Sequence, residues 1–347
     1  MAAQGRLPEA ETALRALAAK APRDGDLRYR LGLVLVKQKK IDEAAQVLEE
    51  ATRIEPAFVF AWLALGDVRL RQGNRAGAAA DARRAKALAG KSVAAWKGLE
   101  ALEDRLGDAA GQAQALETLI RLAPEDRSAY VRLANLLFDH RTSEAARVVA
   151  DAGLRRFPGD AELLRQQGLA FYGLGRKLEA LASFLAAMDA APSDEMAHAS
   201  VETLLSDAGD QLPQVVERLR RFSARRPDSP LGPFLLALAA PSPQEKESLL
   251  AQAIAVDAGF WPAHFERHRL LRQQGKRAEA IEALETTLRL NPNHEGAHFA
   301  LAELYLEAGD REKARAHRIE HHRLRAAAAA EEQKRTAEAP RFTVRLQ

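Results

Sequence analysis

Apolar residues along most of the chain recur at intervals of three and four residues, which is the spacing of one face of an α-helix. Leu31, Leu35, Ala44, Leu48 and Ala51 show this pattern, and charged residues occupy many of the positions between them. Alternation of apolar and polar residues, which is typical of strands, is absent until the last few residues. The pattern predicts an all-α protein.

Proline and glycine interrupt these helical stretches with a period of 34 residues. The prolines of this series are Pro22, Pro56, Pro124, Pro158 and Pro192, and the glycines halfway between them are Gly5, Gly73, Gly107, Gly175 and Gly209. After a loss of two residues the period resumes at Gly275, Pro292 and Gly309. Because glycine can end one helix and proline can stop the next, each period predicts a helical hairpin that stacks on its own copies.

Within one period, Trp62, Leu65, Gly66, Ala78 and Ala82 form a pattern of a Trp, then Leu-Gly, then small residues at a helix crossing. This pattern resembles the tetratricopeptide repeat, although Gly90 stands where its closing proline is expected. Further matches are Leu31, Gly32, Ala44, Leu48 and Pro56, then Gly168, Ala180, Phe184 and Pro192, and finally Leu301, Tyr305, Gly309 and Ala314. The resemblance implies a right-handed superhelical solenoid of antiparallel helix hairpins.

The repeat register divides the chain into a solenoid at residues 1–325 and a C-terminal extension at residues 326–347. The solenoid is expected to contain a half-repeat at 5–22, regular repeats at about 25–227, a degenerate repeat at about 228–258 and further repeats at about 261–325. In the degenerate repeat, prolines such as Pro233 and Pro241 predict a shortened first helix at residues 231–240.

The extension is expected to begin as a helix and to end in an extended tail. Phe342, Val344 and Leu346 alternate with polar residues, as in a short strand at residues 342–346. Such a strand could dock on the sheet edge of a partner, lie across the chain's own groove or have no fixed structure.

Three aromatic residues, Trp62, Trp96 and Tyr130, occupy equivalent places in consecutive repeats. In the same register His198, His264 and His298 take this place in later repeats. Large side chains are needed where two helices of a hairpin diverge, so all six are interpreted as core residues that pack in the hairpin and not as a cage for a ligand.

Several classes of function lack their residues in this chain. There is no cysteine, and hence no disulfide, thiolate metal site or thiol nucleophile. Phosphate-binding glycine loops, nucleophile elbows and buried carboxylate pairs are also missing. We therefore expect a non-catalytic protein without a cofactor, and neither a small-molecule substrate nor nucleic acid is an expected partner.

The sequence carries few clues to a cellular location. It contains no signal sequence and no membrane-spanning segment, so we expect a cytoplasmic protein, or a periplasmic or exported one if an N-terminal signal has been removed. The opening of the chain midway through a repeat fits such a removal as well as a native start. The excess of 39 Arg over 12 Lys, together with abundant Ala, suggests a GC-rich, bacterial genome.

The positive charge of the chain is concentrated at its C-terminal end. Residues 311–347 hold ten Lys or Arg against five Asp or Glu, whereas residues 1–310 hold 41 against 43. A nearly neutral repeat body lacks the continuous basic face that a nucleic-acid backbone requires. The densest basic run is Arg218, Arg220, Arg221, Arg225 and Arg226. It is either a solvent-exposed helix face or a site for an acidic partner.

Histidines suggest an alternative function, a metal- or cofactor-associated accessory protein. His317, His321 and His322 stand outside the aromatic register, and the four-residue spacing of the first two places them on one helix face. No acidic third ligand accompanies them, so no metal site is assigned to them beyond this alternative.

Function is expected in the groove that the first helices of such hairpins line in the family. The positions carried over onto that surface are Tyr29, Leu33, Val36, Phe60, Leu63, Asp67, Leu70, Lys97, Asp104, Val131, Asn135, Phe138, Arg165, Leu169 and Tyr172. Apolar and aromatic anchors with scattered charges suit a partner's amphipathic helix or an extended apolar peptide. The same side chains could instead pack against neighbouring helices. The predicted function is a scaffold or adaptor for one or more proteins, either by itself or as a subunit of a larger assembly docked through its tail.

Overall fold

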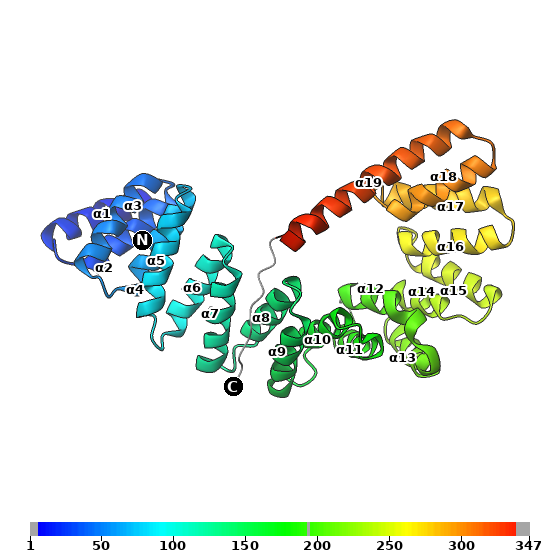
Figure 1. Cartoon of the computed structure of the whole chain (residues 1–347), viewed down its shortest axis with the longest axis horizontal. Coiled ribbons are helices and arrows are strands. Elements are labelled where there is room, and N and C mark those ends of the chain that lie inside the picture. The colour runs from blue at the N-terminus through cyan, green and yellow to red at the C-terminus, as the bar shows by residue number, and fades with distance from the viewer. Residues whose placement is uncertain (1–5, 193–194, 338–347) are drawn as a thin grey trace. The chain divides into compact units, whose positions relative to one another are not determined.

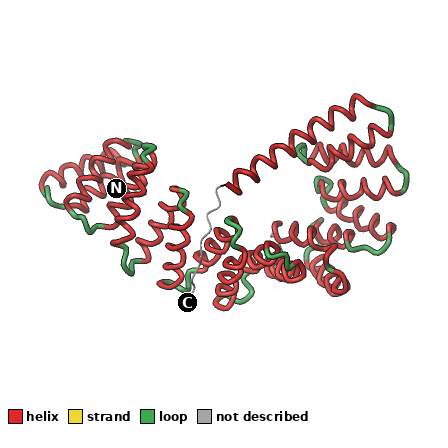
Figure 2. The backbone as a smooth tube through the Cα atoms, in the orientation of Figure 1, coloured by secondary structure: helices red, strands yellow, loops and turns green. Residues whose placement is uncertain are grey.

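The computed structural model of the chain describes residues 6–192 and 195–337. These residues form nineteen α-helices and two short 3-10 helices joined by short loops, and no strand occurs among them (Figures 1 and 2). The predicted all-α class of stacked hairpins is confirmed. The described residues fall into two compact units, unit 1 at residues 6–156 and unit 2 at residues 157–192 and 195–337.

Unit 1 consists of a single helix followed by four hairpins. Its helices are α1 Leu7–Lys20, α2 Gly25–Lys37, α3 Ile41–Ile54, α4 Val59–Arg71, α5 Arg75–Leu88, α6 Val93–Leu106, α7 Ala109–Leu122, α8 Arg127–Asp139 and α9 Ser143–Arg156. The helices pair as α2 with α3, α4 with α5, α6 with α7 and α8 with α9. The first helices also touch their successors, α2 with α4 and α4 with α6, so these helices share one face of the unit.

Unit 2 holds ten further α-helices, most of which pair as hairpins. Its helices are α10 Ala161–Gly173, α11 Lys177–Ala190, α12 Glu195–Leu204, α13 Leu212–Arg225, α14 Leu231–Leu238, α15 Pro243–Val256, α16 Trp261–Gln273, α17 Arg277–Leu290, α18 Glu295–Glu307 and α19 Arg311–Ala337, with 3-10 turns at Leu205–Asp207 and Gly209–Gln211. Helix α14, in the repeat with many prolines, has eight residues. One hydrophobic core nevertheless continues through this repeat, from Ala180 on α11 to Ala263 on α16.

The turn inside most hairpins requires a left-handed backbone. Gly73, between α4 and α5, has φ of 78°. The 34-residue glycine series skips positions 39 and 141, where Lys39 and Arg141 have φ of 63° and 55°. Because a side chain is disfavoured in this region, the repeat geometry imposes the left-handed turn at these two residues against their own preference.

Close helix packing depends on glycines that leave no room for a side chain. A Cβ on Gly32 would lie 2.6 Å from the side chain of Leu48, and one on Gly168 would lie 2.6 Å from the ring of Phe184. In both hairpins the large residue of the second helix occupies the space above the glycine of the first. The small and large residues of the repeat pattern are therefore complementary halves of one contact.

Candidate functional site

The predicted groove residues differ widely in exposure. Leu33, Lys97, Asp104, Asn135 and Tyr172 are exposed, and Tyr29, Val36, Phe60, Asp67, Leu70, Phe138, Arg165 and Leu169 are half-buried. Leu63 and Val131 are buried, so the expectation that they are exposed in a groove is wrong. Leu63 fills the space that Gly98 leaves open, since a Cβ on Gly98 would meet its Cδ1 at 2.8 Å.

An open cavity of about 470 Å³ lies beside a cluster of three arginines in unit 2, and a larger one, of about 660 Å³, lies between α1 and α2 in unit 1. The larger cavity contains two of the predicted groove residues, Leu33 and Val36. Its opposite wall is formed by Leu14 and Leu17 of α1, and Leu17 is 49% exposed. We call this cavity the α1–α2 groove.

Three cationic side chains, Arg30, Lys37 and Arg71, line the α1–α2 groove beside its apolar walls. Arg30 forms an ion pair of 2.6 Å with Asp26, and Arg71 one of 2.9 Å with Asp67. Among the described residues, Lys37 has no ion-pair partner. The groove thus joins an apolar floor to a positively charged margin, which favours a ligand that is apolar on one side and acidic beside it.

The aromatic candidates of unit 1 pack on one another. The Tyr29 ring meets Phe58 edge to face with centroids 5.0 Å apart, and Phe58 meets Phe60 in the same way at 6.1 Å. Burial raises the pKa of the Tyr29 phenol above its ordinary value. Phe58, which links the two predicted residues, is the N-cap residue of α4 and so lies outside the helical positions from which the groove is predicted.

Two of the remaining polar candidates, Lys97 and Asn135, pair with acidic side chains. Lys97 lies 2.7 Å from the carboxylate of Asp126, whose pKa it lowers together with Ser128. Asn135 donates a hydrogen bond of 3.2 Å to Asp139 one turn later. In unit 2, Leu169 and Tyr172 line a small cavity of about 170 Å³.

The interpretation of the repeated aromatic position is supported by a hydrogen bond that recurs in both units. The indole N–H of Trp62 donates to the carbonyl of Pro56, and that of Trp96 donates to the carbonyl of Gly90, both at 2.9 Å. The imidazole Nε2 atoms make the same contact with the carbonyl six residues earlier, in His264 with Ala258 at 3.1 Å and in His298 with Pro292 at 3.0 Å. A carbonyl only accepts, so Nε2 carries the proton and each imidazole replaces an indole.

The histidines suggested for metal binding are not brought together as ligands. Nδ1 of His317 lies 3.0 Å from Nδ1 of His298, and its ring stacks on Tyr305. Burial lowers the pKa of His317. His321 faces Glu295 at 3.4 Å, and the ring of His322 lies 5.4 Å from that of His321. No group of three His, Cys, Asp or Glu side chains suited to a metal ion is found among the described residues.

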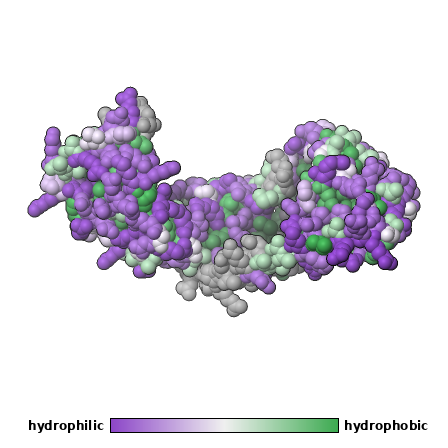
Figure 3. Space-filling view, turned by 90° about the horizontal axis from the view of Figure 1, so that it is seen from above, coloured by the Kyte–Doolittle hydropathy of each residue, from purple (hydrophilic) through white to green (hydrophobic). Residues whose placement is uncertain are grey.

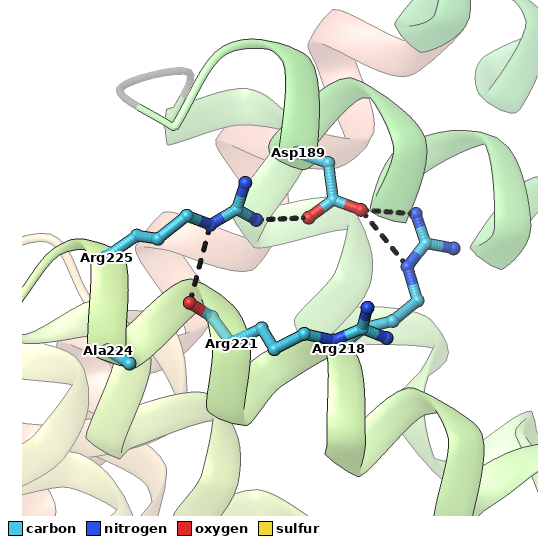
Figure 4. A pocket seen from close by; sticks show the side chains of 5 residues that line it. All are labelled: Asp189, Arg218, Arg221, Ala224 and Arg225. Atoms are coloured by element: carbon cyan, nitrogen blue, oxygen red, sulfur yellow. Dashed lines mark hydrogen bonds and ion pairs between the residues drawn. The ribbon is translucent and has the colours of Figure 1, made fainter.

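The run of arginines at the end of α13 divides between two surfaces. Arg218, Arg221 and Arg225 line the cavity of about 470 Å³ with Asp189 of α11 (Figure 4). Arg220 lines a different cavity, toward α14 and α15, and Arg226 pairs with Asp228 at 3.1 Å. The spacing of three, four and seven residues separates the first three from the others on the helix.

Hydrophilic side chains cover most of the face drawn in Figure 3, and hydrophobic ones show there as separate small areas. Among the described residues no helix is both long and apolar enough to cross a membrane. The tail residues Phe342, Val344 and Leu346 lie outside the described residues, so the docking role expected of them stays a prediction.

Comparison with known proteins identifies the repeat. A family model described as tetratricopeptide repeat matches residues 2–57 and 131–195, and a second with the same description matches residues 271–317. No curated protein sequence matches the chain.

Solved structures show a similar fold. The C-terminal part of a TPR repeat-containing protein from Cytophaga hutchinsonii is 13% identical with a TM-score of 0.52, over 78% of this chain and 97% of that one. YrrB, described as a TPR protein with an unusual peptide-binding site, is 16% identical with a TM-score of 0.44, over 53% of this chain and 95% of that one. Yeast Tom70 is 14% identical with a TM-score of 0.45, over 95% of this chain and 94% of that one.

Proposed function

Because the chain belongs to the tetratricopeptide repeat family, whose fold generally serves as a non-catalytic scaffold for protein interactions, we propose that it is a non-catalytic protein-binding scaffold. Its partner segment is an amphipathic helix with acidic residues beside its apolar face. The observation that carries this proposal is the α1–α2 groove, in which exposed leucines lie between cationic side chains.

The apolar part of the groove supplies the free energy of binding. Leu17 is 49% exposed and Leu33 is 37% exposed, so a bound apolar side chain removes further leucine surface from water. Completing the burial of two such side chains contributes about 1 kcal/mol each. The partner's own apolar side chains gain a similar amount, because they leave water at the same time.

The cationic margin selects among apolar segments. Arg30 and Arg71 already have carboxylate partners, and both arginines stay 44% exposed or more at their side chains. An acidic residue of the partner can therefore approach these cations and Lys37 without full desolvation. Exposed ion pairs of this kind add about 0.2–1 kcal/mol each and favour an acidic over a basic helix.

The test measures binding of a fluorescein-labelled amphipathic peptide of Leu, Ala and Glu to the full chain by fluorescence anisotropy. Leu33→Asp places a charge in the groove and is expected to weaken binding at least about tenfold, because it removes apolar contact and repels the peptide. Leu88→Asp is the matched control, since Leu88 on α5 is 36% exposed and lies outside the groove.

A version of the peptide with Lys in place of Glu separates apolar from electrostatic recognition. It should bind more weakly than the acidic version, and the difference should shrink as salt is added. Equal losses in Leu33→Asp and Leu88→Asp, or a preference for the basic peptide, would contradict the assignment of this groove.

A further inference from the structure

The arginine cluster on α13 points to a second interaction surface, separate from the α1–α2 groove and on a different unit. Asp189, in the last turn of α11, accepts from two guanidinium groups (Figure 4). One carboxylate oxygen lies 2.7 Å from Arg218 Nη2, and the other lies 2.8 Å from Arg225 Nη2. One carboxylate thus holds two cations in place and leaves the cluster with an excess of positive charge.

Arg221 is the member of the cluster with the weakest partner. Its Nε lies 3.9 Å from Glu217, at the limit of an ion pair, and its side chain is 66% exposed. The carbonyl of Arg221 accepts from Arg225 Nε at 3.4 Å, which ties the two residues together along the helix. The guanidinium of Arg221 is therefore available to a ligand beside two guanidiniums that are already oriented.

The opposite side of α13 explains why these arginines face outward. Val215, Leu219 and Phe222 are buried in the core of unit 2. Their positions fix the rotation of the helix, and Arg218, Arg221 and Arg225 follow one another along the exposed side at intervals of three and four residues. The cluster is consequently set by the fold and does not depend on flexible loops.

The basic surface is confined to this one helix. The neighbouring second helices α11 and α15 carry one lysine each, Lys177 and Lys246, and both are paired, with Asp207 at 2.9 Å and Glu266 at 3.0 Å. A nucleic-acid backbone requires a continuous basic stripe, usually with aromatic side chains for stacking, and none of the described residues that line this cavity is aromatic. A short run of carboxylates, by contrast, needs only one patch of cations such as this one.

We propose that Arg218, Arg221 and Arg225 form a docking site for an acidic segment of a partner polypeptide, rich in Asp and Glu. One carboxylate of the segment binds the guanidinium of Arg221. Others bind the exposed N–H groups of Arg218 and Arg225, whose remaining donors stay bound to Asp189. Guanidinium groups suit this ligand because two of their coplanar N–H donors can bond to the two oxygens of one carboxylate. The site does not depend on the α1–α2 groove, so either surface can fail its test without the other.

The experiment measures the anisotropy of a fluorescein-labelled oligoglutamate peptide titrated with the full chain, next to an oligoglutamine peptide and an oligouridylate of equal length. Arg221→Glu should weaken oligoglutamate binding about tenfold, because it replaces one attraction by a repulsion. Asp189→Asn should tighten binding severalfold, because it removes the carboxylate that competes with the ligand. Circular dichroism of each variant checks that the helices are retained.

A matched variant distinguishes this site from general charge effects. Arg84→Glu changes the net charge by the same amount on α5, an exposed second-helix position in unit 1. It should leave oligoglutamate binding unchanged. The proposal is overturned if Arg221→Glu and Arg84→Glu lower the affinity for oligoglutamate equally, or if Asp189→Asn weakens binding. It is also overturned if oligouridylate binds as tightly as oligoglutamate, or if oligoglutamate does not bind.

Discussion

Replacing Glu103 by Gln is expected to stabilise unit 1 at alkaline pH. Glu103 lies in α6 with 5% of its surface exposed, and burial raises the pKa of its carboxyl to about 7. The nearby carboxylate of Asp108 raises this pKa further, whereas Lys86 and Arg83 oppose the effect. Above pH 7 the folded protein must therefore hold a buried negative charge that the unfolded chain exposes to water.

The sign and the size of the effect follow from the pKa difference. The folded state binds its proton more tightly than the unfolded state, so the contribution to stability is present below about pH 4.5 and is lost as pH rises through about 7. One pKa unit corresponds to about 1.4 kcal/mol, and the full loss is therefore about 3 kcal/mol at pH 8. Glutamine resembles the protonated carboxyl and avoids this loss.

The assay is urea unfolding of both proteins near pH 4 and pH 8, followed by far-ultraviolet circular dichroism. Glu103→Gln should gain up to about 3 kcal/mol over the parent at pH 8 and almost nothing near pH 4. An equal gain at both pH values, or no gain at pH 8, would refute the reasoning.

The control is Glu100→Gln on the same helix. Glu100 is 1% exposed, forms an ion pair with Arg132 and accepts a hydrogen bond of 2.8 Å from Gln112. Glutamine removes the negative charge that pairs with Arg132 and should destabilise the protein by about 2 kcal/mol. Two buried glutamates one turn apart are thus expected to respond in opposite directions at pH 8.

Two further predictions concern the backbone and the packing of the repeat. Lys39→Gly and Arg141→Gly should each raise the free energy of unfolding by about 0.5–1 kcal/mol, because glycine adopts the left-handed backbone of these positions without steric strain. Gly73→Ala should lower it by about 1 kcal/mol for the opposite reason. Urea unfolding midpoints measure all three changes. Gly168→Ala should lower it by about 1–3 kcal/mol, because the new methyl group meets the Phe184 ring, and a double variant with Phe184→Leu should recover part of the loss in the same assay.

The all-α fold could be predicted because the punctuation of the repeat is local. A left-handed turn residue ends one helix, and the series of glycines at 34-residue spacing marks most of these turns. Lys39 and Arg141 show why the series has gaps. Stacking on neighbouring hairpins imposes the left-handed backbone even on a residue that does not prefer it. The conformation therefore recurs in each of these turns although the residue type changes.

The register also placed two of its three histidines correctly. His264 and His298 stand at the Trp62 and Trp96 positions, and the structure gives all four the same hydrogen bond to a carbonyl six residues earlier. This position needs a ring whose N–H can reach that carbonyl, and both indole and imidazole provide one. His317 and His321 lie outside this register, and their four-residue spacing is not accompanied by a group of metal-ligating side chains among the described residues.

Exposure along the first-helix face could not be predicted from the register, because it depends on the next repeat. In the 34-residue register Leu63 corresponds to Tyr29 of the preceding repeat, yet Leu63 is buried and Tyr29 is half-buried. Leu63 is covered because Gly98 of the following first helix lets that helix approach it. The residue equivalent to Gly98 in the preceding repeat is Ala64, which carries a methyl group where Gly98 has none. The burial of Leu63 therefore depends on a residue of the neighbouring repeat, which the register of its own repeat does not reveal.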